Sequence, residues 1–334
     1  MLKVIEDEKQ IARYARQFAG SFRPLADERI RVRLGHQGAN FAAKVAWSRK
    51  LGLWTLARTT KGVRYWNTFG TGRPEENGHL AITAEVNFPW TGIDRKTGAA
   101  FAQDAWRRVY AVHRGKIGGG KKGVGKSLFE ENYRGCWAWM EDGDTLAQVA
   151  VIGVLGGGRL ALQVAQFVRK VEKLKSAALI TPQTSLNFSE VAFREELVGN
   201  PPGPAGTSAG DCDHDLIVSQ LANLLLRWKF IVGNDAATDL FVVRPDSRVI
   251  THLIAVSTGL REEETLAAAA GLLLRRAAED VLPAAFLMLP EDQIARYAPR
   301  LRTIGIETLV CRLEGERIVF PDLGRIRMDP RAAF

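Results

Sequence analysis

The chain has few cysteines, and it lacks any run of about 18 apolar residues that could span a membrane as a helix. Its three cysteines, Cys136, Cys212 and Cys311, are far apart in the sequence. Their odd number argues against a disulfide framework, and their spacing argues against a metal site. The first eight residues are too acidic for a secretion signal. These features predict a cytoplasmic protein with reduced thiols and no membrane association.

Lysine is nearly missing from the second half of the chain, where Lys229 is the only lysine after Lys175. Residues 1–175 hold 30 Lys+Arg and 16 Asp+Glu, whereas residues 176–334 hold 16 and 21. Seven of the eight tryptophans also precede residue 140. This shift in composition predicts two domains. A basic, aromatic-rich domain is typical of proteins that bind a polyanion, most often nucleic acid. A basic surface that serves only solubility is the alternative.

Hydrophobic patterning predicts an α+β protein, with a mainly β N-terminal domain and an α/β C-terminal domain that has a mixed sheet. We place the first domain at residues 1–158, a connecting amphipathic helix and linker at 159–185, and the second domain at 186–334. The first domain is expected to have a helix over 7–20 and strands over 30–34, 52–57, 63–67, 79–87 and 107–113. The second is expected to have helices over 213–228, 262–280 and 292–300, and strands over 238–243, 252–257, 284–289 and 307–311.

A loop rich in glycine and lysine is expected over residues 114–127. Glycine lets the backbone approach a phosphodiester closely, and cations release the counter-ions condensed on DNA. The cations of this loop are Arg114, Lys116, Lys121, Lys122 and Lys126. The stretch from Gly120 to Ser127 also fits the phosphate-loop pattern of nucleotide-binding enzymes. That pattern should directly follow a buried parallel strand, which the sequence does not provide, so we favour nucleic acid over a nucleotide or a merely solvated loop.

Two aromatic residues lie beside cations in expected loops. Trp90 precedes Arg95 and Lys96, and Tyr133 is followed by Arg134. Exposed rings in such places can stack on an unpaired or flipped base. For most of the other tryptophans before residue 140, a set that includes Trp106, core packing is the expectation.

Residues 189–323 resemble the PD-(D/E)XK nuclease superfamily, the restriction-endonuclease-like fold, in the order and spacing of their expected elements. Glu195 or Glu196 lies where a first helix is expected, and Asp239 lies at the strand that presents the first catalytic aspartate. Residues 252–258 match the next strand. The alanine-rich stretch 267–274 matches the helix that often carries a glutamine.

The resemblance implies that the nuclease-like site has decayed. Such nucleases need Asp and Glu to hold Mg²⁺ and Lys to orient the attacking water. Here Ala255 stands in the position of the glutamate, Ser257 in that of the lysine and Gly271 in that of the glutamine. Asp239 is then a catalytic remnant. The alternative is an active Mg²⁺-dependent (modification-dependent) restriction endonuclease whose metal is held by other carboxylates, namely Asp235, Glu195, Glu196 or Asp215.

Residues 82–89, 112–120 and 129–135 look like an N-terminal domain that precedes such nuclease domains in bacterial restriction-like proteins. This resemblance implies a module that reads double-stranded DNA, with a modified base as one target, in bacterial defence. Binding would need no cofactor, and Mg²⁺ would be needed only if cleavage survives. A homodimer or a partner nuclease is a further expectation, for which the alanine-rich helix 262–280 is a candidate interface.

Overall fold

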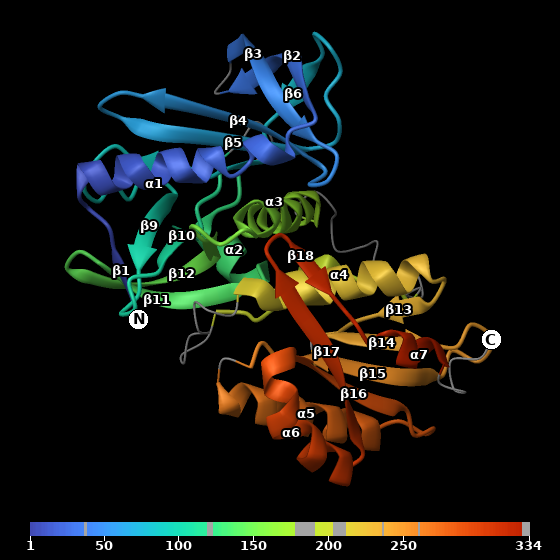
Figure 1. Cartoon of the computed structure of the whole chain (residues 1–334). Coiled ribbons are helices and arrows are strands. Elements are labelled where there is room, and N and C mark those ends of the chain that lie inside the picture. The colour runs from blue at the N-terminus through green and yellow to red at the C-terminus, as the bar shows by residue number, and fades with distance from the viewer. Residues whose placement is uncertain are drawn as a thin grey trace. The chain divides into compact units, whose positions relative to one another are not determined.

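The structure, a computed structural model, describes residues 1–36, 39–118, 123–177, 191–202, 212–235, 237–259 and 261–328. The chain forms two units (Figure 1). Unit 1 comprises Met1–Thr184 and Asn200–Cys212, and unit 2 comprises Ser185–Gly199 and Asp213–Phe334. Within the described residues, no helix is long and apolar enough to cross a membrane.

Unit 1 contains a closed five-stranded barrel and a seven-stranded sheet. Along the chain its elements are β1 (Leu2–Val4), α1 (Glu8–Gly20), a 3₁₀ turn (Arg23–Leu25), β2 (Glu28–His36), β3 (Ala39–Ser48), β4 (Leu53–Thr60), β5 (Arg64–Thr71), β6 (His79–Ala81), β7 (Ala84–Glu85), β8 (Phe88–Pro89), β9 (Ala99–Gln103), β10 (Val109–His113), α2 (Lys126–Asn132), β11 (Cys136–Asp142), β12 (Thr145–Val154) and α3 (Leu160–Ala177).

The barrel has the order β1-β11-β12-β10-β9, and β1 closes it by pairing with both β9 and β11. Side chains alternate between the two surfaces of each strand. On β9, Ala100 and Ala102 join a cluster with members from all five strands, as expected of a barrel interior, whereas Ala99 and Phe101 join the larger core beneath α1 and α3. Alanines suit β9 because a barrel with so few strands leaves little room inside.

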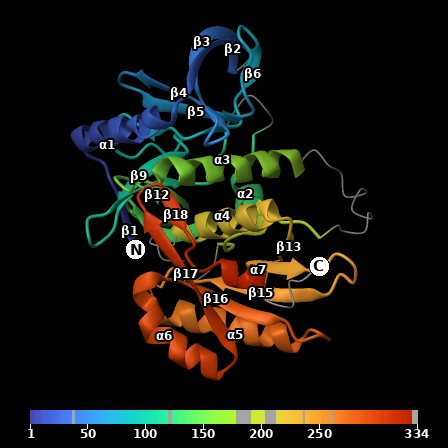
Figure 2. The ribbon, with the colours of Figure 1, turned by 45° about the vertical axis from the view of Figure 1, so that its right-hand side comes forward.

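The sheet of unit 1 has the order β6-β2-β3-β4-β5-β7, with β8 also paired to β5. Figures 1 and 2 show β2 and β3 running side by side as a long hairpin. One face of the sheet is apolar around Trp54 and Trp66. The other face is covered at its β5 end by α1, whose residues Ile11, Ala15 and Phe18 are buried. Helix α1 begins after Asp7, whose Oδ1 accepts a hydrogen bond of 2.8 Å from the Gln10 N–H.

Unit 2 is built on a mixed six-stranded sheet of order β13-β14-β15-β16-β17-β18. Strands β14 and β15 are antiparallel, β15, β16 and β17 are parallel, and β18 is antiparallel to β17. Its elements are a 3₁₀ turn (Glu195–Leu197), α4 (His214–Arg227), β13 (Ile231–Gly233), β14 (Leu240–Val243), β15 (Ile250–Val256), α5 (Glu262–Ala277), β16 (Ala284–Pro290), α6 (Glu291–Thr303), β17 (Ile306–Glu314), β18 (Arg317–Val319) and α7 (Gly324–Met328).

The predicted fold class is confirmed: the protein is α+β, with a mainly β first part and a mixed sheet interleaved with helices in the second. Helices α5 and α6 pack on the parallel strands through a core that includes Leu253, Leu272, Leu287 and Leu301. Helix α3, expected in a connecting segment, belongs to unit 1, where Val164, Phe167 and other residues of its apolar face are buried. Ile250 and Ala255, near the two ends of β15, also pack against this core.

Candidate nucleic-acid interface and nuclease-like site

Three of the cations expected to contact DNA are exposed. Lys96 follows β8, Lys116 follows β10, and Lys126 begins α2. Lys126 lies 3.5 Å from Glu130, an exposed i,i+4 pair that contributes little to stability. These three lysines are available to a polyanion.

The glycine-rich loop is held at its base by unit 1. Ile117 and Val124 form an isolated antiparallel bridge, with both N–H···O distances 3.0 Å. The ammonium of Lys175, from α3, donates to the carbonyl of Gly118 at 3.0 Å. Lys121 and Lys122 lie outside the described residues. The described base of the loop is therefore tied to the core, which fixes where the exposed Lys116 stands.

Asp142 binds two arginines: Arg114, which is largely buried, and Arg95, whose side chain is 55% exposed. Arg114 donates to both oxygens of Asp142, at 2.7 and 2.9 Å, and its side chain is only 11% exposed. Arg95 donates to the Asp142 carbonyl at 2.6 Å and to the Thr145 hydroxyl at 2.9 Å. Burial alone would raise the pKa of Asp142, but hydrogen bonds and charge from Arg114 and Arg95 hold it below its ordinary value. We therefore assign Arg114 a structural role in place of the expected DNA contact.

Tyr133 also faces inward. It is buried, its ring stacks on Phe129 with centroids 4.5 Å apart, and it meets Trp137 edge-on. The expected stacking of Tyr133 on a base does not fit this position. Its neighbour Arg134 is half-buried and donates to the carbonyl of Glu131 at 2.9 Å.

The exposed indole of unit 1 is Trp106 and not Trp90. Trp90 is half-buried and stacks on Tyr65 at 5.3 Å. Trp106, expected in the core, is 77% exposed at the turn between β9 and β10. Asp104 organises this turn by accepting from the N–H groups of Trp106 and Arg108, both at 2.9 Å. The sequence signal for a turn here is Asp104, because an aspartate side chain can accept hydrogen bonds from the backbone N–H groups that follow it. A residue within such a turn, as Trp106 is, lies at the surface.

The surroundings of the glycine-rich loop do not match those of a phosphate loop. Strand β10, which precedes the loop, is antiparallel to both of its neighbours, β9 and β12. Helix α2, which follows, has only seven residues. A phosphate loop needs a parallel strand and a helix whose N-terminus meets the phosphates. This context disfavours the nucleotide-binding alternative.

In unit 2, Asp239 lies directly beside Ala255. Leu240 pairs with Ile254, so the register places Asp239 opposite Ala255. One oxygen of Asp239 accepts from the Val256 N–H at 2.8 Å, and the carboxylate contacts the ring of His214 at 3.3 Å. The Asp239 carboxylate therefore already has two partners within unit 2, the Val256 N–H and the His214 ring.

His214 brings two carboxylates together. Its Nδ1 lies 3.2 Å from Asp215, and its Nε2 faces Asp239. Burial disfavours the imidazolium, but Asp239 and Asp215 outweigh this effect and raise the pKa of His214 well above its ordinary value. The imidazolium thus supplies the positive charge between the two acids.

The side chains at position 255 in β15 and at position 257 directly after it both contact the rest of unit 2. Ala255 packs against the core under α5 and α6. Ser257 is 3% exposed; its hydroxyl lies 2.9 Å from the hydroxyl of Thr265 in α5 and accepts from the Gly259 N–H at 3.2 Å. Gly271 lies on the exposed side of α5. The serine therefore ties the end of β15 to α5.

The other candidate carboxylates do not surround Asp239. Glu195 and Glu196 lie on a three-residue 3₁₀ turn instead of the expected helix. Asp235 accepts from the Ala237 N–H at 2.9 Å and lies 3.8 Å from Arg275. Within the described part of the chain, no three His, Cys, Asp or Glu side chains are grouped as metal ligands. Asp239, Asp215 and an imidazolium, with no side-chain oxygen at position 255, do not form a donor set suited to Mg²⁺.

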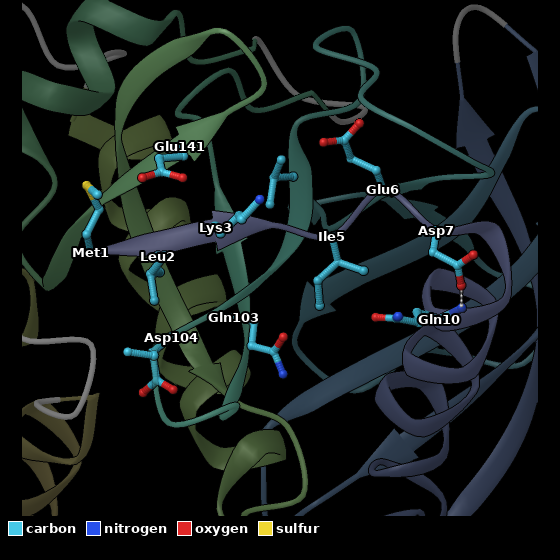
Figure 3. Close-up of a pocket in the computed structure, with 12 residues that line it drawn as sticks. Met1, Leu2, Lys3, Ile5, Glu6, Asp7, Gln10, Gln103, Asp104 and Glu141 are labelled. Atoms are coloured by element: carbon cyan, nitrogen blue, oxygen red, sulfur yellow. Dashed lines mark hydrogen bonds between the residues drawn. The ribbon is translucent and has the colours of Figure 1, made fainter.

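One pocket of about 530 Å³ lies beside β1 in unit 1 (Figure 3). Glu141 and Asp104 flank β1 from either side in this view. Two of the carboxylates that line it have partners: Asp7 caps α1, and Asp104 binds the side chains of Arg108 and Tyr110. No converging reactive groups mark this pocket as catalytic.

No protein-family model, curated protein or solved structure matches this chain.

Proposed function

We propose that this protein binds double-stranded DNA through the basic surface of unit 1, and that unit 2 is a nuclease-like domain without cleavage activity of its own. The observation that carries the proposal is the excess of cations over residues 1–175, part of which the fold leaves exposed, as at Lys96, Lys116 and Lys126. Such cations attract phosphates and release counter-ions whatever the base sequence.

The loss of cleavage is supported by the environment of Asp239. Catalysis of the nuclease type would need this carboxylate to hold a metal ion beside a second acid and a lysine. Asp239 instead accepts the Val256 N–H and faces the His214 ring. The element order α4, β13, β14, β15, α5, β16 accords with the resemblance on which the nuclease-like assignment rests.

An active Mg²⁺-dependent nuclease is the second candidate, because Asp215 and Asp239 converge on one imidazole. Metal binding there would require the imidazolium of His214 to leave. Mg²⁺-dependent cleavage by the natural chain that is lost in both Asp215→Ala and Asp239→Ala would favour this candidate.

The test is an incubation of plain and base-modified duplex DNA with the protein, with and without Mg²⁺ or Mn²⁺, followed by native and denaturing gels. We expect a mobility shift and no new DNA ends. Metal-dependent ends that disappear in Asp239→Ala would overturn the assignment of a decayed site, and no shift at low salt would overturn DNA binding itself.

A further inference from the structure

We propose that the exposed face of the β2–β3 hairpin is the main phosphate-binding surface of unit 1, and that it takes the backbone of double-stranded DNA. We name it the arginine face; it consists of Arg29, Arg31 and Arg33 on β2 and Lys44 on β3. The inference rests on the proposed DNA binding and assigns it to residues outside the loop 114–127.

The pleat of β2 creates the arginine face. Ile30, Val32 and Leu34 are buried in the apolar cluster of the sheet, so the alternate residues of the strand point the other way and are exposed. At about 3.4 Å per residue, successive arginines of the row are about 7 Å apart. A straight row of cations at regular spacing suits a polymer whose phosphates are also regularly spaced.

The fold does not use these four charges. No side chain of the arginine face makes a hydrogen bond or ion pair within the described residues, in contrast to the buried Arg114. The nearby acids are engaged elsewhere. Asp27 accepts a backbone N–H, and Glu28 pairs with Arg73 at 2.9 Å. Glu76 accepts the backbone N–H of Arg31 at 3.3 Å, so its carboxylate lies beside the row, but within the described residues it forms no ion pair with a side chain of the arginine face.

The arrangement is unfavourable without a ligand. Arg31 lies directly opposite Lys44 in the antiparallel pair. Like charges in directly opposed positions destabilise a hairpin. Because no acid among the described residues forms an ion pair with these side chains, an external anion accounts for their presence better than folding does.

Small side chains leave room beside the cations. Arg33 is opposite Ala42, and Arg29 is opposite Ala46. A hollow of about 510 Å³ lies beside the row. Its lining includes Arg23, Arg29 and Lys44, the acids Asp27 and Glu28, and small residues such as Ala46 and Ala57. A phosphate backbone can approach such a surface closely. Of the large apolar residues that line the hollow, Phe22 is buried and Leu56 is half-buried. The hollow therefore lacks the exposed large apolar residues with which a protein enters a lipid interface, and nucleic acid fits better than a membrane.

The test compares two variants of the full chain that lose the same charge. Arg29→Ala/Arg31→Ala/Arg33→Ala removes the row on β2, and Lys9→Ala/Lys61→Ala/Lys173→Ala removes three exposed cations elsewhere in unit 1. Binding of a labelled duplex is followed by fluorescence anisotropy across a series of salt concentrations. We expect the arginine variant to bind at least tenfold more weakly, with the slope of log affinity against log salt reduced by about 0.9 for each lost phosphate contact. The control variant should stay within about twofold of the natural chain.

Each outcome decides between the two proposals. If the natural chain binds duplex DNA and the arginine variant binds equally well with an unchanged salt slope, the inference about the arginine face is wrong, whereas the proposal of DNA binding is not affected. If the natural chain binds no duplex at low salt, both fail. If it binds an acidic peptide and no DNA, the face serves a protein partner and the inference is overturned. Unchanged thermal midpoints of both variants exclude unfolding as the cause, since all substituted side chains are exposed.

Discussion

Two cations only two residues apart, Arg114 and Lys116, have opposite roles in this fold. Arg114 forms a buried ion pair with Asp142, whereas Lys116 is exposed. Removing one partner of a buried pair leaves an uncompensated charge and costs about 3 kcal/mol or more. Arg114→Ala should therefore lower the urea midpoint strongly, whereas Lys116→Ala should change the free energy of unfolding by less than about 0.5 kcal/mol. Equal effects of the two substitutions on stability would contradict the structural role of Arg114.

His113 should make unit 1 sensitive to acid. Its ring is fully buried, and its Nδ1 accepts from the Gly115 N–H at 3.0 Å, which requires a neutral ring. Burial, together with the charge of Arg114, lowers the pKa of His113 to about 3. Between about pH 3 and about pH 6.5, His113 is protonated in the unfolded chain but neutral in the native protein. The free energy of unfolding therefore decreases as the pH falls, by up to about 1.4 kcal/mol per pH unit.

The variant His113→Phe removes this titration and should flatten the decline in the urea midpoint between pH 7 and pH 4.5, even if it is less stable at pH 7. Tryptophan fluorescence reports mainly on unit 1, which holds seven of the eight tryptophans. The exposed His79→Gln serves as the control and should keep the natural pH dependence. Parallel curves for His113→Phe and the natural chain would show that His113 is not the group responsible.

At the scale of elements, the end of β15 is fastened to α5 by Ser257. Ser257→Ala loses its hydrogen bonds to Thr265 and Gly259 and should cost about 1 kcal/mol. Ser257→Lys, the side chain that the nuclease resemblance calls for, should cost several times more, because it buries an unpaired charge. Gly271→Gln is the control. Its added Cβ meets no atom within 4 Å, and replacing a helical glycine should leave stability equal or raised.

Urea unfolding followed by far-UV circular dichroism measures these differences. The combined variant Ala255→Glu/Ser257→Lys should stay unable to cleave DNA with Mg²⁺, since the Asp239 carboxylate keeps its bonds to Val256 and His214. If the Ala255→Glu/Ser257→Lys variant is stable and cleaves DNA with Mg²⁺, these two side chains are all that the site lacks for cleavage.

Local hydrophobic patterning predicted the helices and strands whose apolar residues recur at regular spacing along the sequence. The alternation of Ile30 to Leu34 became β2, and the helices at 7–20 and 262–280 became α1 and α5 with small shifts at their ends. Strand β3 was missed because Ala42, Ala43 and Lys44 have low strand propensity, and it forms through pairing with β2. Closure of the barrel by β1 depends on partners about 100 and 138 residues away, which no local pattern reveals.

The candidate site was predictable in type but not in orientation. The sequence showed that cations and rings gather before residue 140, and the nuclease resemblance implied that Asp239, Ala255 and Ser257 belong to one site. It did not show that Asp142 would draw Arg114 inward, since the two are 28 residues apart. Nor did it show His214 beside Asp239, a contact across 25 residues that depends on how α4 packs.

At the scale of the whole molecule, the uneven charge of the chain predicts where DNA stabilises it. A ligand that binds the native state of one unit suppresses the opening of that unit, by about 2.7 kcal/mol at a ligand concentration 100 times the dissociation constant. Residues 1–175 carry the excess of cations, whereas residues 176–334 have more acids than bases. Saturating duplex DNA should therefore slow hydrogen exchange in peptides of unit 1, with β2 and β3 among them.

Peptides of unit 2, such as those covering β16 and α6, should exchange at nearly the same rate with and without DNA. The measurement is hydrogen–deuterium exchange by mass spectrometry at low salt, and repetition at about 1 M salt is the control, because screening and lost counter-ion release should abolish the protection. Protection that survives high salt would point to base or apolar contacts. Protection confined to unit 2 would show that the acidic half carries the DNA site, which the distribution of charge argues against.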